Sequence, residues 1–192
     1  SNSIKKFIKV VKNINFYWIL VLMHTKEELS LIERCQSPDS IQSYLDSLAY
    51  DWSLDTYIRR SFRRTVQDQM SACLCSALTA AHLLESHEHE PVIMVLYGPP
   101  SSHTVAVYHQ DGHIGTVAKS RYDEGKGKPP SFGSESELVE SYASFYRSIG
   151  FMYDQFGLID LRKLGIDWRF NERNLVHLNI SGELDKFPKY KI

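Results

Sequence analysis

The stretch "HTVAVYHQDGHIGTVAKS", from His103 to Ser120, has the composition of two β-strands joined by a short turn. Valine, threonine, tyrosine and isoleucine recur on both sides of its centre, as is typical of strands. Asp111 and Gly112 lie between the two halves and favour a two-residue hairpin turn, because both residue types tolerate positive φ. The segment therefore predicts an antiparallel hairpin, and the rest of the fold can be assigned outward from it.

The residues before this hairpin predict a series of short helices. Ser37 and Pro38 fit the N-cap and first-turn positions of one helix, a second is expected from Leu54 to Val66, and a third begins near Ser71 as its N-cap.

The residues next to the hairpin complete the pattern. "PVIMVLY", residues 91–97, is a further β-rich run, and Ser134 with Glu137 has the spacing of a capping box that opens a later helix, which Gly150 ends. Helices first and a mainly antiparallel sheet afterwards predict an α+β fold in which the N-terminal helices pack on the sheet.

The chain is long enough for one domain, which we expect to cover residues 23–192 after an N-terminal extension at 1–22. Its 192 residues are 43% hydrophobic, enough for one substantial core. In the extension, Ile4, Phe7, Ile8 and Val11 share one helical face, which would allow contact with a membrane surface. Packing of this segment onto the domain explains the same pattern and is the expected interpretation. The apolar run is too short to span a bilayer.

Charge and cysteine content exclude several classes of function. The formal net charge of −1 gives no reason to expect nucleic-acid binding, and the four arginines of "YIRRSFRR", residues 57–64, are interpreted as one solvated helical stripe. Three cysteines make no disulfide framework, which favours a reducing, cytoplasmic setting. His82, His87 and His89 lack a fourth ligand at recognisable spacing, so we expect an exposed cluster at the end of a helix, with no metal and no cofactor.

The stretch "SACLCSALTAAHLLE", residues 71–85, offers a candidate nucleophile at the start of a helix. A thiol is nucleophilic as thiolate, which the positive end of a helix dipole favours. Cys73 would lie in the first turn, while Cys75 is roughly 200° further round the helix, so the two cannot face one partner. Both a catalytic thiol and two buried structural cysteines fit this pattern, and Cys73 is the preferred nucleophile.

His103 is the best candidate for a base. Such an imidazole needs a third group to hold it in the right tautomer. With a two-residue turn, Ser120 would lie opposite His103; with a three-residue turn, Arg121 would lie there instead. Neither position holds a carboxylate.

Taken in order, "CLCSALTAAHLLE", "HTVAVYHQDGHIGTVAKSR", "ELVESY" and "GLIDLRKLGIDWRFNERN" resemble small bacterial domains of the transglutaminase-like superfamily, over roughly residues 29–188. The resemblance implies a papain/transglutaminase-like architecture and a catalytic set of Cys73, His103 and a third residue near Ser120, commonly Asp in that superfamily. Papain-like enzymes themselves separate cysteine and histidine by roughly 130 to 150 residues, whereas Cys73 and His103 are 30 apart.

Two functions follow as expectations. The first is a cytoplasmic thiol-dependent acyl transferase or amide hydrolase acting on a protein or peptide, with Ser120 orienting the ring and backbone N–H groups, with Gln67 or Gln69, stabilising the oxyanion. The second is an inactive binding module that keeps the fold and lacks the triad carboxylate.

Overall fold

The computed structural model describes residues 22–52 and 58–192, and these described residues fall in two compact units that divide between Arg34 and Cys35. In the first unit, α2 (Lys26–Arg34) begins with a capping box: Thr25 Oγ1 accepts from the Glu28 N–H, and the Glu28 carboxylate accepts from the Thr25 N–H. The amphipathic segment expected at 1–22 lies outside the described residues except for Leu22. All further description concerns the second unit.

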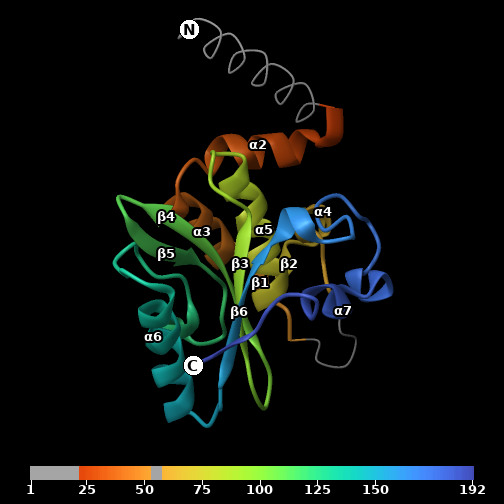
Figure 1. Cartoon of the computed structure of the whole chain (residues 1–192). Coiled ribbons are helices and arrows are strands. Elements are labelled where there is room, and N and C mark those ends of the chain that lie inside the picture. The colour runs from red at the N-terminus through yellow and green to blue at the C-terminus, as the bar shows by residue number, and fades with distance from the viewer. Residues whose placement is uncertain (1–21, 53–57) are drawn as a thin grey trace, which may run out of the picture. The chain divides into compact units, whose positions relative to one another are not determined.

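An antiparallel sheet of five strands forms the centre of the second unit, in the order β5-β4-β3-β6-β7 (Figure 1). Its strands are β3 (Val92–Tyr97), β4 (His103–Gln110), β5 (His113–Val117), β6 (Gln155–Asp160) and β7 (Tyr190–Lys191). A short parallel pair, β1 (Ala49–Tyr50) with β2 (Met70–Ser71), stands apart from it.

Helices precede this sheet and fill its connections. They are α3 (Pro38–Ser47), α4 (Phe62–Asp68), α5 (Cys73–Glu85), α6 (Glu135–Ser148) and α7 (Ile180–Leu184), with 3-10 turns at Asp123–Gly125, Leu161–Lys163 and Leu175–Leu178. The predicted α+β class, with helices ahead of a mainly antiparallel sheet, is confirmed.

The hairpin has the predicted register. Gln110 pairs with His113 across a turn in which Asp111 and Gly112 both have positive φ, 51° and 79°. The two-residue turn is therefore the correct alternative. The β4–β5 ladder ends at the Ala106–Val117 pair, before it reaches Ser120.

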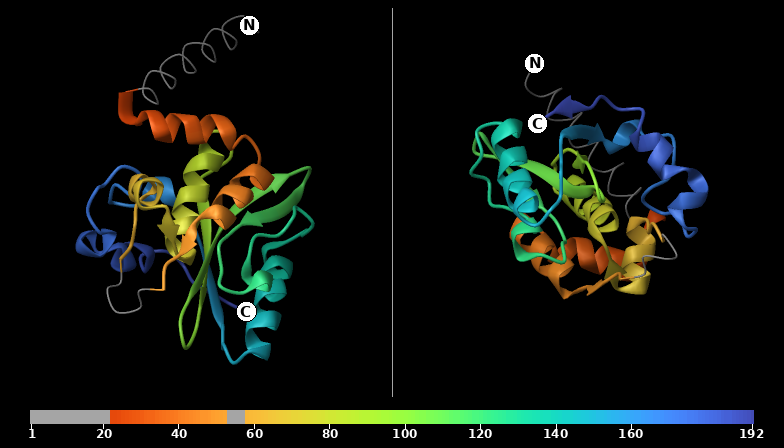
Figure 2. Two further views of the ribbon diagram at one scale, coloured as in Figure 1. Left: turned by 180° about the vertical axis from the view of Figure 1, so that it is seen from behind. Right: turned by 90° about the horizontal axis from the view of Figure 1, so that it is seen from below.

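Opposite faces of the sheet carry different helices (Figure 2). Helix α5 packs on β4 and β3. On the other face Val105 and Val107 of β4 belong to a buried cluster with Leu138 and Tyr142 of α6. Because strand side chains alternate between faces, His103 lies on the α6 side, where its ring centroid is 5.7 Å from that of Tyr142.

Two predicted helix starts are wrong. The helix expected from Leu54 begins at Phe62, where the Ser61 side chain caps it by accepting from the Arg64 N–H; residues 53–57 lie outside the described range. Helix α5 has Ala72 as its N-cap, without a side-chain hydrogen bond, because the Ser71 hydroxyl is bonded to Ser76 instead.

Within the described residues, no helix is long and apolar enough to cross a bilayer.

Candidate active site

Cys73 is the first residue of α5 and is half-buried at the wall of a cavity of about 410 Å³. Since Ala72 offers no side-chain oxygen, the N–H groups of the first turn keep their donor capacity toward this side. The cavity is large enough for a small ligand or one side chain of a peptide. His103 and Ser120 line it as well, so the structure brings all three predicted site residues to one cavity.

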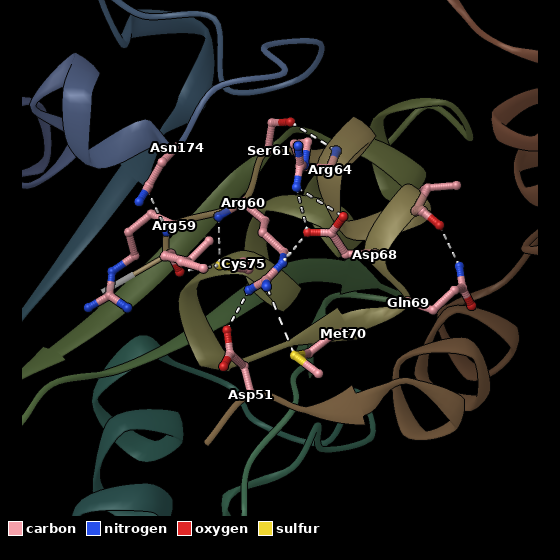
Figure 3. Close-up of polar contacts among 12 residues, drawn as sticks. Asp51, Arg59, Arg60, Ser61, Arg64, Asp68, Gln69, Met70, Cys75 and Asn174 are labelled. Carbon is pink, nitrogen blue, oxygen red and sulfur yellow. Dashed lines mark hydrogen bonds and ion pairs between the residues drawn. The ribbon is translucent and has the colours of Figure 1, made fainter. Parts of the chain in front are cut away.

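Cys75 has a different environment and does not line the cavity. It is 1% exposed, and its sulfur accepts a hydrogen bond at 3.1 Å from the backbone N–H of Arg60 (Figure 3). Burial raises the pKa of this thiol. Cys75 therefore serves as an acceptor that fixes the chain before α4, and Cys73 is the cysteine that a ligand can reach.

The His103 ring is held by a backbone carbonyl. Its Nε2 lies 2.9 Å from the oxygen of Gly125. Because a carbonyl oxygen only accepts, Nε2 carries the proton, and the lone pair of the neutral ring is on Nδ1. The ring thus has the tautomer that a base needs, without a carboxylate partner.

Ser120 does not make the ring contact that we expected of it. Its hydroxyl lies 3.0 Å from the hydroxyl of Tyr146 and accepts the N–H of Tyr122. A Cβ added to Gly125 would collide with Ser120 Oγ and with the Tyr146 hydroxyl. Ser120 therefore packs against the residue whose carbonyl holds His103, and any effect that it has on the ring passes through Gly125.

Burial keeps both candidate catalytic groups neutral. It raises the pKa of Cys73, outweighing the Thr104 N–H and the Arg59 guanidinium, which favour the thiolate. It lowers the pKa of His103 to about 4, where the Lys128 ammonium acts in the same direction and the Gly125 carbonyl opposes it. Among the described residues, no hydrogen bond joins Cys73 to the His103 ring, so the resting pair is a thiol and a neutral imidazole.

The remaining cavity wall is aromatic and carries charges of both signs. Its aromatic residues are Tyr50, Trp52, Tyr97, Tyr122, Tyr146, Phe151 and Tyr153. Arg59 and Arg121 supply two cations, and the carboxylates of Asp51 and Asp185 also line the cavity. Gln67 and Gln69, expected as oxyanion donors, do not line it: both are exposed on and after α4.

The arginine-rich stretch does not form one solvated stripe. Arg60 precedes α4, is 6% exposed and forms ion pairs with Asp51 and Asp68 (Figure 3). The prediction failed because it placed all four arginines on one helix, whereas that helix begins only at Phe62. The ion pair between Arg60 and Asp51 links two parts of the chain, residues 50–52 and 58–59, that line the cavity.

The histidine cluster expected at the end of α5 is wrong for His82. This residue is 3% exposed and packs against Phe62, with ring centroids 4.3 Å apart, and against Trp168. Phe62 and Trp168 are themselves almost fully buried, so this part of the helix is covered. Among the described residues, no three metal-binding side chains gather at one point.

Sequence analysis missed Gly125, whose carbonyl holds the His103 ring, and Arg121, which lines the cavity. Gly125 looked like one of several loop glycines in "DEGKGK", and Arg121 was considered only as an alternative partner of His103. Comparison with known proteins adds no assignment: no protein-family model and no curated protein matches the chain.

Proposed function

We propose that the protein is a thiol-dependent acyl transferase or amide hydrolase with a papain/transglutaminase-like arrangement, in which Cys73 is the nucleophile and His103 the base. The observation that supports this most is the pairing of an accessible thiol at a helix start with a neutral imidazole of defined tautomer in one cavity. The resemblance to transglutaminase-like domains agrees with it.

The chemistry would begin from a neutral pair, because burial favours the neutral form of both groups. As Sγ attacks the carbonyl carbon of an amide, the thiol proton passes to Nδ1 of His103. The N–H groups at the start of α5 stabilise the developing oxyanion. His103 then gives the proton to the departing amine, which leaves a thioester on Cys73. Water or a second amine releases the acyl group.

A second candidate, a binding module without turnover, is favoured by one observation. Catalytic cysteines usually have a lowered pKa, whereas the pKa of Cys73 is raised by burial. In this alternative the cavity binds a ligand and the thiol only lines it.

Trapping of an acyl-enzyme separates the two candidates. The chain is incubated with p-nitrophenyl acetate at pH 7.5, and the protein is digested and analysed by mass spectrometry. The proposed enzyme gains one acetyl group on Cys73; Cys73→Ala gains none at that peptide, and His103→Gln gains it at least about tenfold more slowly.

The matched control is Cys75→Ser, which removes the other thiol of the same helix and keeps an acceptor for Arg60. It should acetylate at Cys73 like the wild type. If His103→Gln acetylates at Cys73 as fast as the wild type, the enzymatic proposal is wrong. It is also wrong if the folded wild type is not acetylated at Cys73, and in either case the binding module remains.

A further inference from the structure

Two carboxylates that line the cavity beside Cys73 have cationic partners outside the lining. Asp51 is ion-paired with Arg60, and Asp185 lies 2.8 Å from the Lys189 ammonium. Neither Arg60 nor Lys189 belongs to the cavity lining, whereas Arg59 and Arg121 do. The acidic residues of the lining therefore have cations of their own outside it.

Arg121 is presented to the cavity without an acidic partner. Its guanidinium lies over the rings of Tyr122 and Phe151, 5.1 Å and 6.0 Å from their centroids. No carboxylate among residues 22–52 and 58–192 lies within ion-pair distance of it. Stacking on aromatic faces holds a guanidinium by its planes and leaves its N–H edge available for a carboxylate.

Hydrogen bonds hold the backbone around Arg121 and around Arg59. Ser120, directly before Arg121, is bonded through its hydroxyl to the Tyr122 N–H directly after it. Arg59 is fixed similarly: its N–H donates to Asn174 Oδ1, and its carbonyl accepts from Leu175. Figure 3 shows the Arg59 side chain extending away from the Arg60 ion pairs.

Arg121 and Cys73 share neighbours. Burial raises the pKa values of Tyr50, Tyr146 and Tyr153; the Cys73 thiol acts in the same direction on each, and the Arg121 guanidinium acts against it. The guanidinium and the sulfur are thus both close to the same three phenols.

We propose that Arg121 binds a carboxylate of the acyl donor next to the carbon that Cys73 attacks. The substrate class is then an acidic peptide or another amide with a carboxylate near the reacting carbonyl. This inference rests on the proposed function in taking Cys73 as the attacking thiol, but anion binding in the cavity does not require turnover.

The test compares the alkylation of Cys73 by iodoacetate, which carries a carboxylate one bond from the reacting carbon, with alkylation by neutral iodoacetamide. Rate constants are measured at the Cys73 peptide, and N-acetylcysteine is the reference thiol. The iodoacetate-to-iodoacetamide ratio should exceed the reference ratio by about tenfold, as one charge-assisted hydrogen bond would give. Added salt should lower it.

Charge variants show which residue is responsible. Arg121→Gln should lower the ratio about fivefold or more, and Arg121→Lys should keep part of it. Arg173→Gln, an exposed arginine outside the cavity, should leave the ratio unchanged. A wild-type ratio equal to the reference, or one that Arg121→Gln leaves intact, overturns the proposal.

The outcomes separate this inference from the proposed function. A ratio sensitive to Arg121 in a protein that forms no acyl-enzyme supports an anion-binding module. Acyl-enzyme formation with a ratio insensitive to Arg121 supports the enzyme and rejects the acidic substrate. If neither reagent reaches Cys73 in the folded protein, both proposals fail, because a cavity closed to a two-carbon reagent is closed to a substrate.

Discussion

At the scale of single residues, the acceptor that orients His103 is the main-chain oxygen of Gly125. The position of this oxygen depends on the absence of a Cβ atom in glycine. The carbonyl of Gly125 takes the place where a triad would have a carboxylate. Ser120 and Tyr146 occupy the space that a Cβ at Gly125 would need. A neutral acceptor can fix the tautomer of the ring, but it stabilises an imidazolium less than a carboxylate does.

Gly125→Ala should therefore impair the site by displacing this carbonyl. We expect acetylation of Cys73 by p-nitrophenyl acetate to slow by about tenfold or more, since a small displacement of a reacting group lowers the reaction rate strongly. Gly133→Ala is the matched control, because a Cβ there would meet only Glu137, at 3.6 Å. Equal rates in both variants would show that the carbonyl does not position the ring.

The buried imidazole also makes stability depend on pH. His103 has a pKa of about 4 in the fold and about 6.5 when unfolded. The unfolded chain thus binds a proton more readily, and the stability that depends on the neutral ring is fully present above pH 6.5 and lost as the pH falls toward 4. The loss should be about 3 kcal/mol.

Urea unfolding at pH 7.5, 5.5 and 4.5 measures the contribution of His103 to the free energy of unfolding. The wild type is compared with His103→Gln, which has no titratable group at this position. The wild type should lose more stability on acidification than the variant. Parallel losses would indicate that the ring is not buried in its neutral form.

At the scale of elements, the Arg60 ion pairs join three short segments that follow one another in the chain, with Asp51 nine residues before Arg60 and Asp68 eight residues after it. Arg60 and Asp51 are both almost fully buried, at 7% and 6% side-chain exposure, and Asp68 at the end of α4 completes the cluster (Figure 3). The desolvation of such a pair is compensated only while both partners are present.

Asp51→Asn should lower the free energy of unfolding by about 2 kcal/mol or more, because Arg60 would keep its buried charge with Asp68 as its remaining partner. Asp123→Asn removes a carboxylate that is 90% exposed and pairs with Lys126, so its effect on the free energy of unfolding should be much smaller than that of Asp51→Asn. Chemical denaturation of both variants checks this. Similar small effects would mean that the cluster contributes little to stability.

Elements with local signals were predictable, and those defined by tertiary contacts were not. The Asp111–Gly112 turn and the caps at Ser37 and Ser134 were identified correctly, since each depends on a few adjacent residues. The start of α4 was misplaced because the Cys75 acceptor and the Arg60 ion pairs, which hold the chain directly before Phe62 outside the helix, are tertiary contacts that the sequence does not show.

The same distinction applies to the candidate site. Cys73 and His103 could be proposed from their order and spacing, and both line the cavity. The ring acceptor could not be found, because a carbonyl oxygen leaves no trace in residue type. Extending the hairpin register suggested Ser120, but the ladder ends at Val117 and the chain then turns so that Gly125 reaches the ring.

At the scale of the whole second unit, the candidate site combines residues from both sides of the sheet. Cys73 belongs to α5, which packs on one face, and the His103 ring lies among Tyr142 and Tyr146 of α6 on the other. The spacing between α5 and the sheet therefore affects the distance between the Cys73 sulfur and the His103 ring. Fully buried alanines of α5, such as Ala77, keep that spacing small.

Ala77→Leu should disturb stability and site together. Overpacking this fully buried position is expected to destabilise the fold by about 1 to 3 kcal/mol and to slow acetylation of Cys73 at temperatures where the variant is folded. Ala49→Leu, at an exposed position in β1, is the control and should change neither. A destabilised but fully reactive Ala77→Leu would show that the site tolerates movement of the helix.

The carbonyl that holds His103 is a main-chain group, which every residue type would supply at this position. Deleting side chains one by one along the chain would not remove that oxygen, and its contribution would emerge only when an added methyl group at residue 125 forces it aside. In related sequences, a side chain in the third position would therefore not identify this arrangement. The informative feature would be a glycine at the position of Gly125 that no larger residue replaces.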